Sequence, residues 1–293
     1  IGNYYGATSG AINWRENQYD LLLQSGSRVG DPVRIVGTNP HIFGFHLRSD
    51  VRAASRGTGD NAYIYFGLND SVGNVTGTIP VNENAFAISG AFPSASSQFC
   101  AELWDQLAKT GITEPSLKTA FVYNNNMDLF SNIHTEISPS LDSIIYWFNK
   151  RSINLYGEAL LKTIAAQQKR GNTTDSGVAV IQDFWQSEGI NAAELNIVDG
   201  SGLSPLNRVT THAQVRILQY AMKQSWFPEF LQSLPVYNGI TMKSGTIRNV
   251  KGYAGYHTNS AGKTFIFSFL VNNYNGSPSS LVNKMYVVLN MLK

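Results

Sequence analysis

The sequence predicts an α+β fold, in which a β-rich first part precedes an antiparallel sheet packed with helices. Two observations predict it. Before residue 130, short apolar and aromatic runs alternate with Gly, Asn, Asp and Pro, as in antiparallel strands and their turns. After residue 130, apolar residues recur every three or four positions, as in amphipathic helices, and three strand-like segments interrupt this pattern.

The first part, residues 1–132, is predicted to be β-rich, with a single helix near 94–110. Ser94 or Ser96 can cap the start of that helix. An apolar stripe along it is expected from Phe99, Leu103 and Leu107. The predicted strands are Tyr19–Leu23, Val33–Val36, Ile42–Leu47, Ala62–Phe66 and Ala85–Ile88.

The second part, residues 133–293, is predicted to combine helices with a small sheet. Helices are expected over 138–151, 154–169, 174–188 and 212–223, and in a closing helix whose Leu281, Met285, Val288 and Leu292 face one way. Strands are expected near 239–246, 250–258 and 263–273, the last two joined by the turn Asn259–Gly262. A hairpin-containing sheet between helices is a layered α+β arrangement.

Composition argues against several classes of function. The net charge is +2 and no run of Lys or Arg concentrates it, so nucleic acid and anionic membrane surfaces are not expected partners. Cys100 is the only cysteine, which rules out an internal disulfide, and we expect it to pack as a small hydrophobic residue. The five His residues show no metal-ligand spacing, so no metal or other cofactor is expected.

The chain is expected to be a piece of a longer exported protein. No apolar stretch approaches the roughly 20 residues that span a bilayer, and the first residues lack the order of a signal peptide. Charged residues make up 14% of the chain, which suits an envelope or secreted protein better than a cytosolic one. Because Ile1 is not a natural start, we expect an upstream part, including any export signal, to have been removed or never included.

Two short strings point to chemistry. Ser152-Ile153-Asn154 lies where one predicted helix ends and the next begins, and Lys243-Ser244-Gly245-Thr246 lies on a predicted strand next to a hairpin. Each string alone is a weak signal, because Ser and Asn commonly cap helices and most strand lysines are solvated. Together, and in these positions, they match two of the three motifs of an acyl-transfer site that binds penicillin.

With two further strings, Val198–Ser204 and Gly252–Tyr256, the chain resembles the class C low-molecular-mass penicillin-binding proteins, the D-Ala-D-Ala carboxypeptidase and endopeptidase family. The resemblance implies a penicillin-binding, β-lactamase-like transpeptidase fold for residues 133–293. It is looser before that, where Thr76–Pro80 and the helix near Trp104 resemble domains that the family inserts after its nucleophile.

The third motif of this family, a Ser-x-x-Lys that carries the nucleophile, is expected in a missing N-terminal segment of the same protein. The only match in these residues is Ser260-Ala261-Gly262-Lys263. It spans the tip of a predicted hairpin, whereas a Ser and a Lys three positions apart meet reliably on a helix. We therefore reject this match, and we expect the chain alone to be inactive.

The resemblance assigns catalytic roles to three residues. Ser152 would pass a proton to the leaving amine, and Lys243 would supply a positive charge close to Ser152 and to the terminal carboxylate of the peptide. Asn154 would hold the amide of the substrate and the upstream Lys together, since its side chain both donates and accepts hydrogen bonds.

Three further residues would bind substrate. Ser244 would donate a hydrogen bond to the carboxylate, and Gly245 would let the strand approach the peptide closely enough to pair with it. The backbone N–H of Thr246 would be one of two oxyanion donors. The loop Asp199–Ser204 is expected to support the site rather than to react.

The resemblance thus implies a serine-type D-Ala-D-Ala peptidase of the periplasm or another extracytoplasmic compartment, which acts on peptidoglycan stem peptides and binds β-lactams through an acyl-enzyme. Two alternatives stay open. One is a non-catalytic peptidoglycan-binding module, suggested by the β-rich first part and the Tyr-rich start. The other is a serine esterase or a β-lactamase-like hydrolase.

Overall fold

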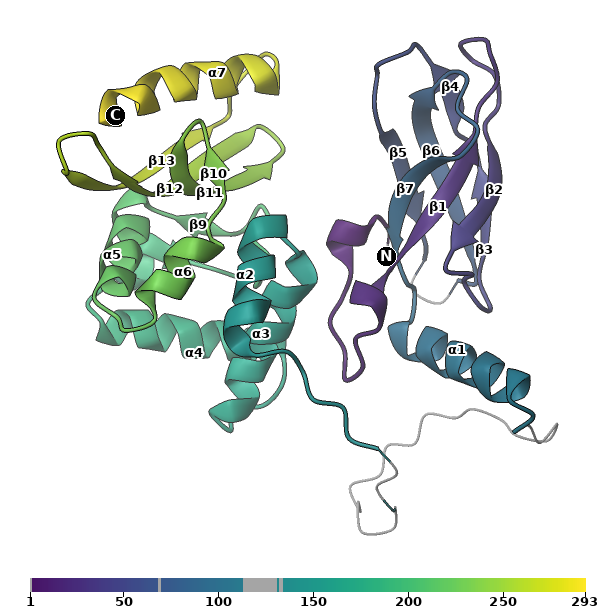
Figure 1. Ribbon diagram of the computed structural model, residues 1–293, viewed down its shortest axis with the longest axis horizontal. Helices are drawn as coiled ribbons and strands as arrows, with labels where there is room; N and C mark the ends of the chain where they lie inside the picture. Colours follow the sequence, from purple (N-terminus) through teal and green to yellow (C-terminus); the bar gives the residue numbers. More distant parts are fainter. Residues whose placement is uncertain (1, 68–69, 113–130, 132–133) are drawn as a thin grey trace. The chain divides into compact units, whose positions relative to one another are not determined.

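The computed structural model describes residues 2–67, 70–112, 131 and 134–293 (Figure 1). The chain forms two compact units, Ile1–Ile137 (unit 1) and Ser138–Lys293 (unit 2). The predicted division between residues 132 and 133 lies outside the described residues. Each unit has hydrophobic core residues of its own.

Unit 1 contains two sheets. Its strands are β1 (Gln18–Gln24), β2 (Arg34–Asn39), β3 (His46–Ser49), β4 (Arg52–Ala54), β5 (Asn61–Tyr65), β6 (Val72–Pro80) and β7 (Phe86–Ala91). The first sheet has the order β2-β1-β7 and is antiparallel. In the second sheet, β6 pairs in parallel with β3 and β4 and antiparallel with β5. The β-rich first part that the sequence predicts is therefore present.

The core of unit 1 follows from alternation along the strands. Every second residue of β1 is buried, and Tyr19, Leu21 and Leu23 are almost inaccessible to solvent. These side chains share one apolar cluster with Ile64 of β5 and Val75 of β6. Residues from both sheets thus form a single core.

Two details of unit 1 differ from the sequence prediction. The expected strand Ile42–Leu47 is extended only from His46, because the chain bends at Gly44, which has a φ of +74°. Helix α1 (Ala95–Lys109) begins at the expected Ser94 cap, but Leu103 of the expected stripe is 47% exposed. The buried residue of α1 is Gln98, whose amide donates to the carbonyl of His41 at 2.7 Å.

Unit 2 has helices near each predicted position. They are α2 (Leu141–Arg151), α3 (Asn154–Gln167), α4 (Thr174–Ser187), α5 (Thr211–Met222), α6 (Phe227–Ser233) and α7 (Pro278–Leu289). The strands are β8 (Leu195–Asn196), β9 (Arg208–Val209), β10 (Val236–Tyr237), β11 (Ile240–Ile247), β12 (Val250–Thr258) and β13 (Thr264–Asn272). Helix α6 and strands β8 to β10 are additional to the predicted elements.

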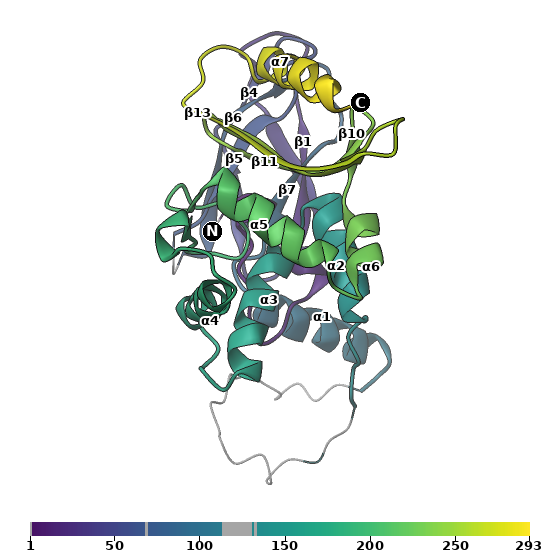
Figure 2. The ribbon, with the colours of Figure 1, turned by 90° about the vertical axis from the view of Figure 1, so that its left-hand side faces the viewer.

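The main sheet of unit 2 has the antiparallel order β10-β11-β12-β13. Helix α7 covers one of its faces, and α5, α2 and α6 lie on the other side (Figure 2). On the second side, the hydroxyl of Tyr256 in β12 donates to the carbonyl of Leu218 in α5 at 2.8 Å. The predicted α+β class is confirmed by this arrangement.

The face of α7 that meets the sheet was predicted with one error. Met285 and Leu289 are buried there with Ile240 and Met242 of β11, whereas Val288 is 50% exposed. The apolar stripe therefore passes through Leu289 instead of Val288, since a step of four residues keeps a helical side chain on the same face as Met285.

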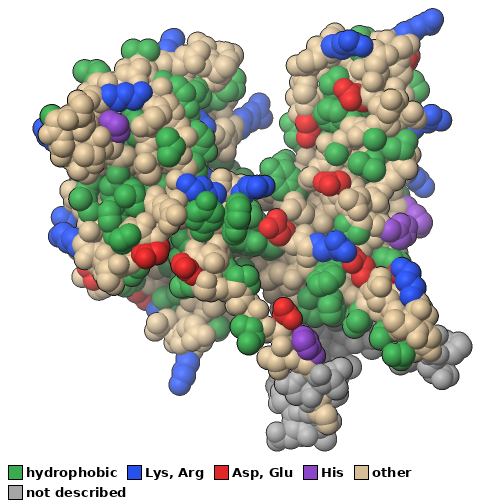
Figure 3. Space-filling model, in the orientation of Figure 1, with side chains coloured by type: hydrophobic (Ala, Val, Ile, Leu, Met, Phe, Trp, Pro, Cys, Tyr) green, Lys and Arg blue, Asp and Glu red, His purple; other side chains and the backbone are tan. Residues whose placement is uncertain are grey.

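The surface carries little concentrated charge. On the face shown in Figure 3, most Lys and Arg side chains lie as separate groups among neutral and hydrophobic ones. Within the described ranges, none of the helices combines the length and the apolar character that crossing a membrane requires.

Candidate active site

The Ser-Ile-Asn string forms a tight turn between two helices. Helix α2 ends at Arg151 and α3 begins at Asn154, so only Ser152 and Ile153 connect them. Ser152 adopts left-handed backbone angles, with φ 54° and ψ 47°. Such angles are uncommon for a residue with a side chain and tend to cluster at functional sites. The turn leaves Ser152 exposed at the junction of the two helices.

Lys243 reaches this turn from the sheet. Its Nζ donates to Ser152 Oγ at 2.9 Å and to the carbonyl oxygen of Ser244 at 2.8 Å. Ser152 and Lys243 lie 91 residues apart in the sequence. The fold of unit 2 therefore brings the two predicted catalytic side chains into direct contact.

Alternation along β11 explains the direction of Lys243. Ile240 and Met242 are buried against α7, and successive residues of a strand point to opposite faces. The side chain of Lys243 is therefore directed to the face on which α2 and α3 lie. The apolar residues of the strand thus fix the orientation of its polar one.

Burial and a second cation both act on Lys243. Removal from water lowers the pKa of the Lys243 ammonium, and the positive charge of Lys251 lowers this pKa further. Burial also lowers the pKa of Lys251 itself. Both effects disfavour the charged form of Lys243, so the ammonium loses its proton at a lower pH than a solvated lysine would.

This arrangement predicts a pH effect of Lys251. Replacing it by glutamine removes a like charge, so the pKa of Lys243 should rise. If activity requires the Lys243 cation, the alkaline limb of the pH profile for β-lactam acylation of the full-length protein should move to higher pH. The control is Lys284→Gln, an exposed lysine on α7, which should leave the limb in place. A limb that moves to lower pH in Lys251→Gln would contradict the assignment.

Asn154 is placed beside the same turn. It is the first residue of α3, two positions after Ser152, and it is half-buried. Its position in the first helical turn is set by the packing of α3, described below. The predicted pair of Ser152 and Asn154 therefore shares one end of α3.

Ser244 departs from the expected grouping. Its hydroxyl lies 3.5 Å from the hydroxyl of Tyr237. Because neighbouring residues of a strand point to opposite faces, the Ser244 side chain lies away from that of Lys243. The structure thus brings Ser152 and Lys243 together but does not bring the Ser244 hydroxyl to them.

Gly245 and Thr246 lie at an open edge of the sheet. In the described structure β10 pairs only with Ile240 and Thr241, and the N–H of Met242 donates to Pro235 at 2.9 Å. Backbone groups of alternate residues point to the same edge of an antiparallel strand, so the N–H groups of Ser244 and Thr246 point the way that of Met242 does. Apart from Gly245 and its two chain neighbours, no atom of the described residues lies within 4 Å of the position a Cβ would take at Gly245.

Thr246 also carries a contact that the sequence did not suggest. Its Oγ1 accepts a hydrogen bond from Lys251 Nζ at 2.7 Å, across the β11–β12 pair. The same ammonium lies 5.0 Å from the centre of the Tyr253 ring. The ammonium of Lys251 is thus a second cation, next to Lys243, that lies beside Thr246, the residue whose backbone N–H is the proposed oxyanion donor.

The distinctive loop 199–204 is held together by Asp199. Its two carboxylate oxygens accept from the N–H groups of Gly202 at 2.6 Å and Ser204 at 2.7 Å. Oδ1 also accepts from the side-chain amide of Asn207 at 2.9 Å. The loop is therefore a rigid turn, as a supporting role requires.

The loop packs directly on α3. Glu158 Oε1 accepts from the N–H groups of Gly200 at 3.1 Å and Ser201 at 2.9 Å. A Cβ on Gly157 would lie 2.3 Å from the carbonyl oxygen of Gly200, and one on Gly200 would lie 2.2 Å from that of Gly157. Only two glycines allow this approach, which sets the position of the first turns of α3 and so of Asn154.

A second set of contacts anchors the end of α2. Asn149 Nδ2 donates to the buried Ser233 Oγ at 2.7 Å, and Lys150 Nζ donates to the carbonyl of Leu234 at 2.6 Å. Ser233 and Leu234 lead into β10 and so into the sheet that carries Lys243. Sequence analysis did not predict these contacts, nor those of Gly157 and Glu158, because no motif marks them.

The rejected Ser-x-x-Lys match, Ser260–Lys263, does not lie on a helix. Ser260 and Lys263 are exposed in the β12–β13 turn, where Asn259 Oδ1 accepts from the N–H groups of Ala261 and Lys263. The turn that the sequence predicts here is confirmed. Among the described residues, no group of three His, Cys, Asp or Glu side chains is placed to hold a metal ion.

Comparisons with known proteins point to the family that the sequence resembles. A family model described as the D-Ala-D-Ala carboxypeptidase 3 (S13) family matches residues 1–239. A D-alanyl-D-alanine carboxypeptidase of Actinomadura sp. (strain R39) is 30% identical over 165 residues, covering 49% of this chain and 30% of that protein. The D-alanyl-D-alanine carboxypeptidase DacB of Haemophilus influenzae is 23% identical over 157 residues, covering 47% of this chain and 33% of that protein. Each match thus spans about a third of the relative's length.

Solved structures show the same fold. Penicillin binding protein 4 of Haemophilus influenzae matches with a TM-score of 0.73 and 19% identity, over 98% of this chain and 70% of that one. The same protein in complex with a β-lactam matches with a TM-score of 0.67 and 18% identity, over 96% of this chain and 71% of that one. The predicted penicillin-binding fold is confirmed by these likenesses.

Proposed function

The chain belongs to the D-Ala-D-Ala carboxypeptidase 3 (S13) family, and we propose that it is part of a serine-type D-Ala-D-Ala carboxypeptidase or endopeptidase that acts on peptidoglycan stem peptides and is acylated by β-lactams. The observation that carries this proposal is the 2.9 Å contact between Lys243 Nζ and Ser152 Oγ. Family membership favours a peptidase over an esterase or a β-lactamase. A non-catalytic peptidoglycan-binding module stays a prediction.

In the proposed reaction, a serine from a helical Ser-x-x-Lys outside these residues attacks the carbonyl carbon of the penultimate D-Ala. Its proton passes to the lysine of that motif, and the C–N bond then breaks to leave an acyl-enzyme that water hydrolyses. The ammonium of Lys243 donates to Ser152 Oγ, so the Ser152 hydrogen can be directed elsewhere. Ser152 would donate this hydrogen to the nitrogen of the leaving amine and would take in return the proton that the lysine of the Ser-x-x-Lys motif removed from the nucleophile.

The open edge of β11 suits the binding of an extended peptide. A substrate that pairs with this edge would place its terminal carboxylate near the cation of Lys243. The N–H of Thr246 would face the carbonyl oxygen on which negative charge develops. Gly245 leaves the space beside the strand empty, which such an approach requires. The Ser244 side chain lies on the other face of β11, so its hydroxyl would reach the carboxylate only after a local change of the strand backbone.

The proposed substrate also implies a place of action. Peptidoglycan stem peptides lie outside the cytoplasmic membrane, so the protein would act in the periplasm or an equivalent extracytoplasmic compartment. The 14% of charged residues is in keeping with this location.

Incubation with a β-lactam tests the function. Intact-mass measurement should show one covalent adduct on the full-length protein when it carries a helical Ser-x-x-Lys, and none on these 293 residues alone. Heat-denatured protein is the control for nonspecific acylation. An adduct on the 293-residue chain, at Ser260 or elsewhere, would contradict the proposed division of the site. Failure of the full-length protein to react would contradict the function.

A further inference from the structure

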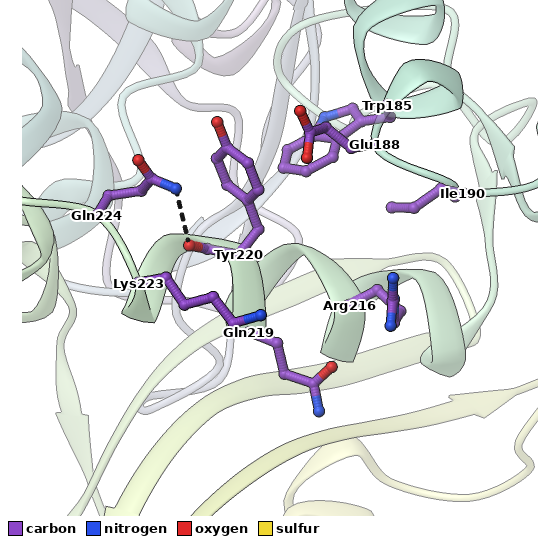
Figure 4. Close-up of a pocket in the computed structure, with 8 residues that line it drawn as sticks. All are labelled: Trp185, Glu188, Ile190, Arg216, Gln219, Tyr220, Lys223 and Gln224. Atoms are coloured by element: carbon purple, nitrogen blue, oxygen red, sulfur yellow. Dashed lines mark hydrogen bonds between the residues drawn. The ribbon is translucent and has the colours of Figure 1, made fainter.

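Unit 2 has a pocket between the end of α4 and the outer face of α5 (Figure 4). Its volume is about 240 Å³. It is lined by Trp185, Glu188, Ile190, Arg216, Gln219, Tyr220, Lys223 and Gln224. None of these residues belongs to the candidate active site, so the pocket needs a separate explanation.

Helical spacing builds one wall of the pocket. The α5 side chains recur at steps of three and four residues, which places them along one face: Arg216, Gln219, Tyr220, Lys223 and Gln224. The last of these is partly fixed, because Gln224 Nε2 donates to the carbonyl of Tyr220 at 3.3 Å (Figure 4). The wall therefore presents two cations and two amides beside a phenol ring.

The opposite wall is aromatic and acidic. Trp185 and Glu188 lie three residues apart at the end of α4, facing the α5 side chains (Figure 4). The rings of Trp185 and Tyr220 meet edge to face, with centroids 5.3 Å apart, which holds both walls in place. Ile190, which is 5% exposed, is the buried apolar residue of the pocket.

The three charged groups of the pocket do not neutralise each other. In the part of the chain that the structure describes, Glu188, Arg216 and Lys223 form no ion pair and no side-chain hydrogen bond, although nearby charges do pair, as Arg170 does with Asp183. Charges of both signs thus line one small pocket and are solvated by water instead of by each other. A ligand that carries both signs could satisfy them.

We propose that this pocket binds a zwitterionic amino acid or dipeptide. The ligand's carboxylate would lie at Arg216 or Lys223, its ammonium at Glu188, and its apolar part against the Trp185 and Tyr220 rings. A polyanion would meet the repulsion of Glu188, and a polycation that of the two basic residues. The pocket volume of about 240 Å³ lies below the roughly 300–1,000 Å³ of pockets that hold drug-sized ligands, which suits a dipeptide better than a longer peptide or a glycan.

The exposure of the charges limits the affinity. Glu188, Arg216 and Lys223 all lie at the surface, where ion pairs are weak and screened by salt. Binding should therefore be weak and should weaken further as the ionic strength rises. Such a site would respond to a small solute only at high concentration.

Ligand-observed NMR on the 293-residue chain tests the proposal. The probe is L-alanyl-L-alanine, because the proposed catalytic site acts on D,D-peptides, and the comparison ligands are its N-acetyl and C-terminal amide forms. Each capped form loses one charge and should bind about two- to five-fold more weakly than the free dipeptide. Equal binding of all three ligands, or no binding of the dipeptide, would overturn the proposal.

Charge variants locate the site. Glu188→Gln should weaken binding of the free dipeptide by about two- to five-fold but should not weaken binding of the N-acetyl form further, because both changes remove the same ion pair. Lys284→Gln, an exposed lysine on α7, is the matched control and should bind normally. Lys243→Ala should also bind normally, so loss of binding in that variant would place the ligand in the candidate active site and overturn the proposal.

Discussion

Replacing Lys243 by alanine should slow acylation by a β-lactam about 10²–10³-fold, the loss typical of removing one preorganised group that stabilises developing charge. The Lys243 ammonium is held 2.9 Å from Ser152 Oγ, in a partly buried position where a charge acts more strongly than in water. The rate of labelling of the full-length protein by a fluorescent penicillin measures the effect.

Stability distinguishes a catalytic loss from a folding defect. Burial disfavours the Lys243 ammonium, as its lowered pKa shows, so the alanine variant should unfold at the same temperature as the parent or higher. The control Lys284→Ala, on the exposed side of α7, should change neither property. An acylation rate within ten-fold of the parent would remove Lys243 from the mechanism.

Replacing Gly157 by alanine should destabilise unit 2 by about 1–3 kcal/mol through overpacking, and here toward the upper end. The new Cβ would lie 2.3 Å from the carbonyl oxygen of Gly200, and a backbone atom cannot move aside by changing rotamer. The gain of ~1 kcal/mol from alanine over glycine in a helix offsets only part of this loss. Urea denaturation measures the free energy of unfolding.

Gly245→Ala is the matched control for that experiment. Among the described residues, none beyond the two chain neighbours has an atom within 4 Å of the Cβ position at Gly245, so the added methyl group should leave the free energy of unfolding unchanged or raise it. If Gly157→Ala proved as stable as Gly245→Ala, the close packing of α3 on the loop 199–204 would be wrong. The displaced loop should also disturb Asn154 and thus acylation.

The motif pattern predicts that Ser152 and Lys243 meet, and the periodicity of the apolar residues places each of them. Ser152 lies at the end of a predicted helix, and Lys243 lies on one face of a predicted strand. Ser152 follows an amphipathic helix, and Lys243 alternates with the buried residues of a strand, so both positions can be read from apolar periodicity. The α+β class follows from the same patterns. Periodicity predicts which face of a helix or strand is buried, but it does not predict which elements pack against each other.

Contacts between elements that are distant in the sequence could not be predicted from it. The Gly157–Gly200 approach and the Asn149–Ser233 hydrogen bond join elements 43 and 84 residues apart, and each involves common residue types in ordinary positions. The two wrong faces have a similar origin. Leu103 and Val288 both fit a helical stripe by spacing, but the width of the covering surface decides which apolar residues are buried.

Within the described part of unit 2, the edge of β11 beyond Thr241 is unpaired, and this has a consequence besides substrate binding. A strand with unpaired N–H and C=O groups is a template for the same edge of another molecule, which is a common origin of aggregation. Two basic residues, Lys243 in β11 and Arg248 directly after it, lie along this edge strand. They would repel an identical edge while attracting the carboxylate of a peptide, so the strand can remain open to substrate without joining two copies of the protein.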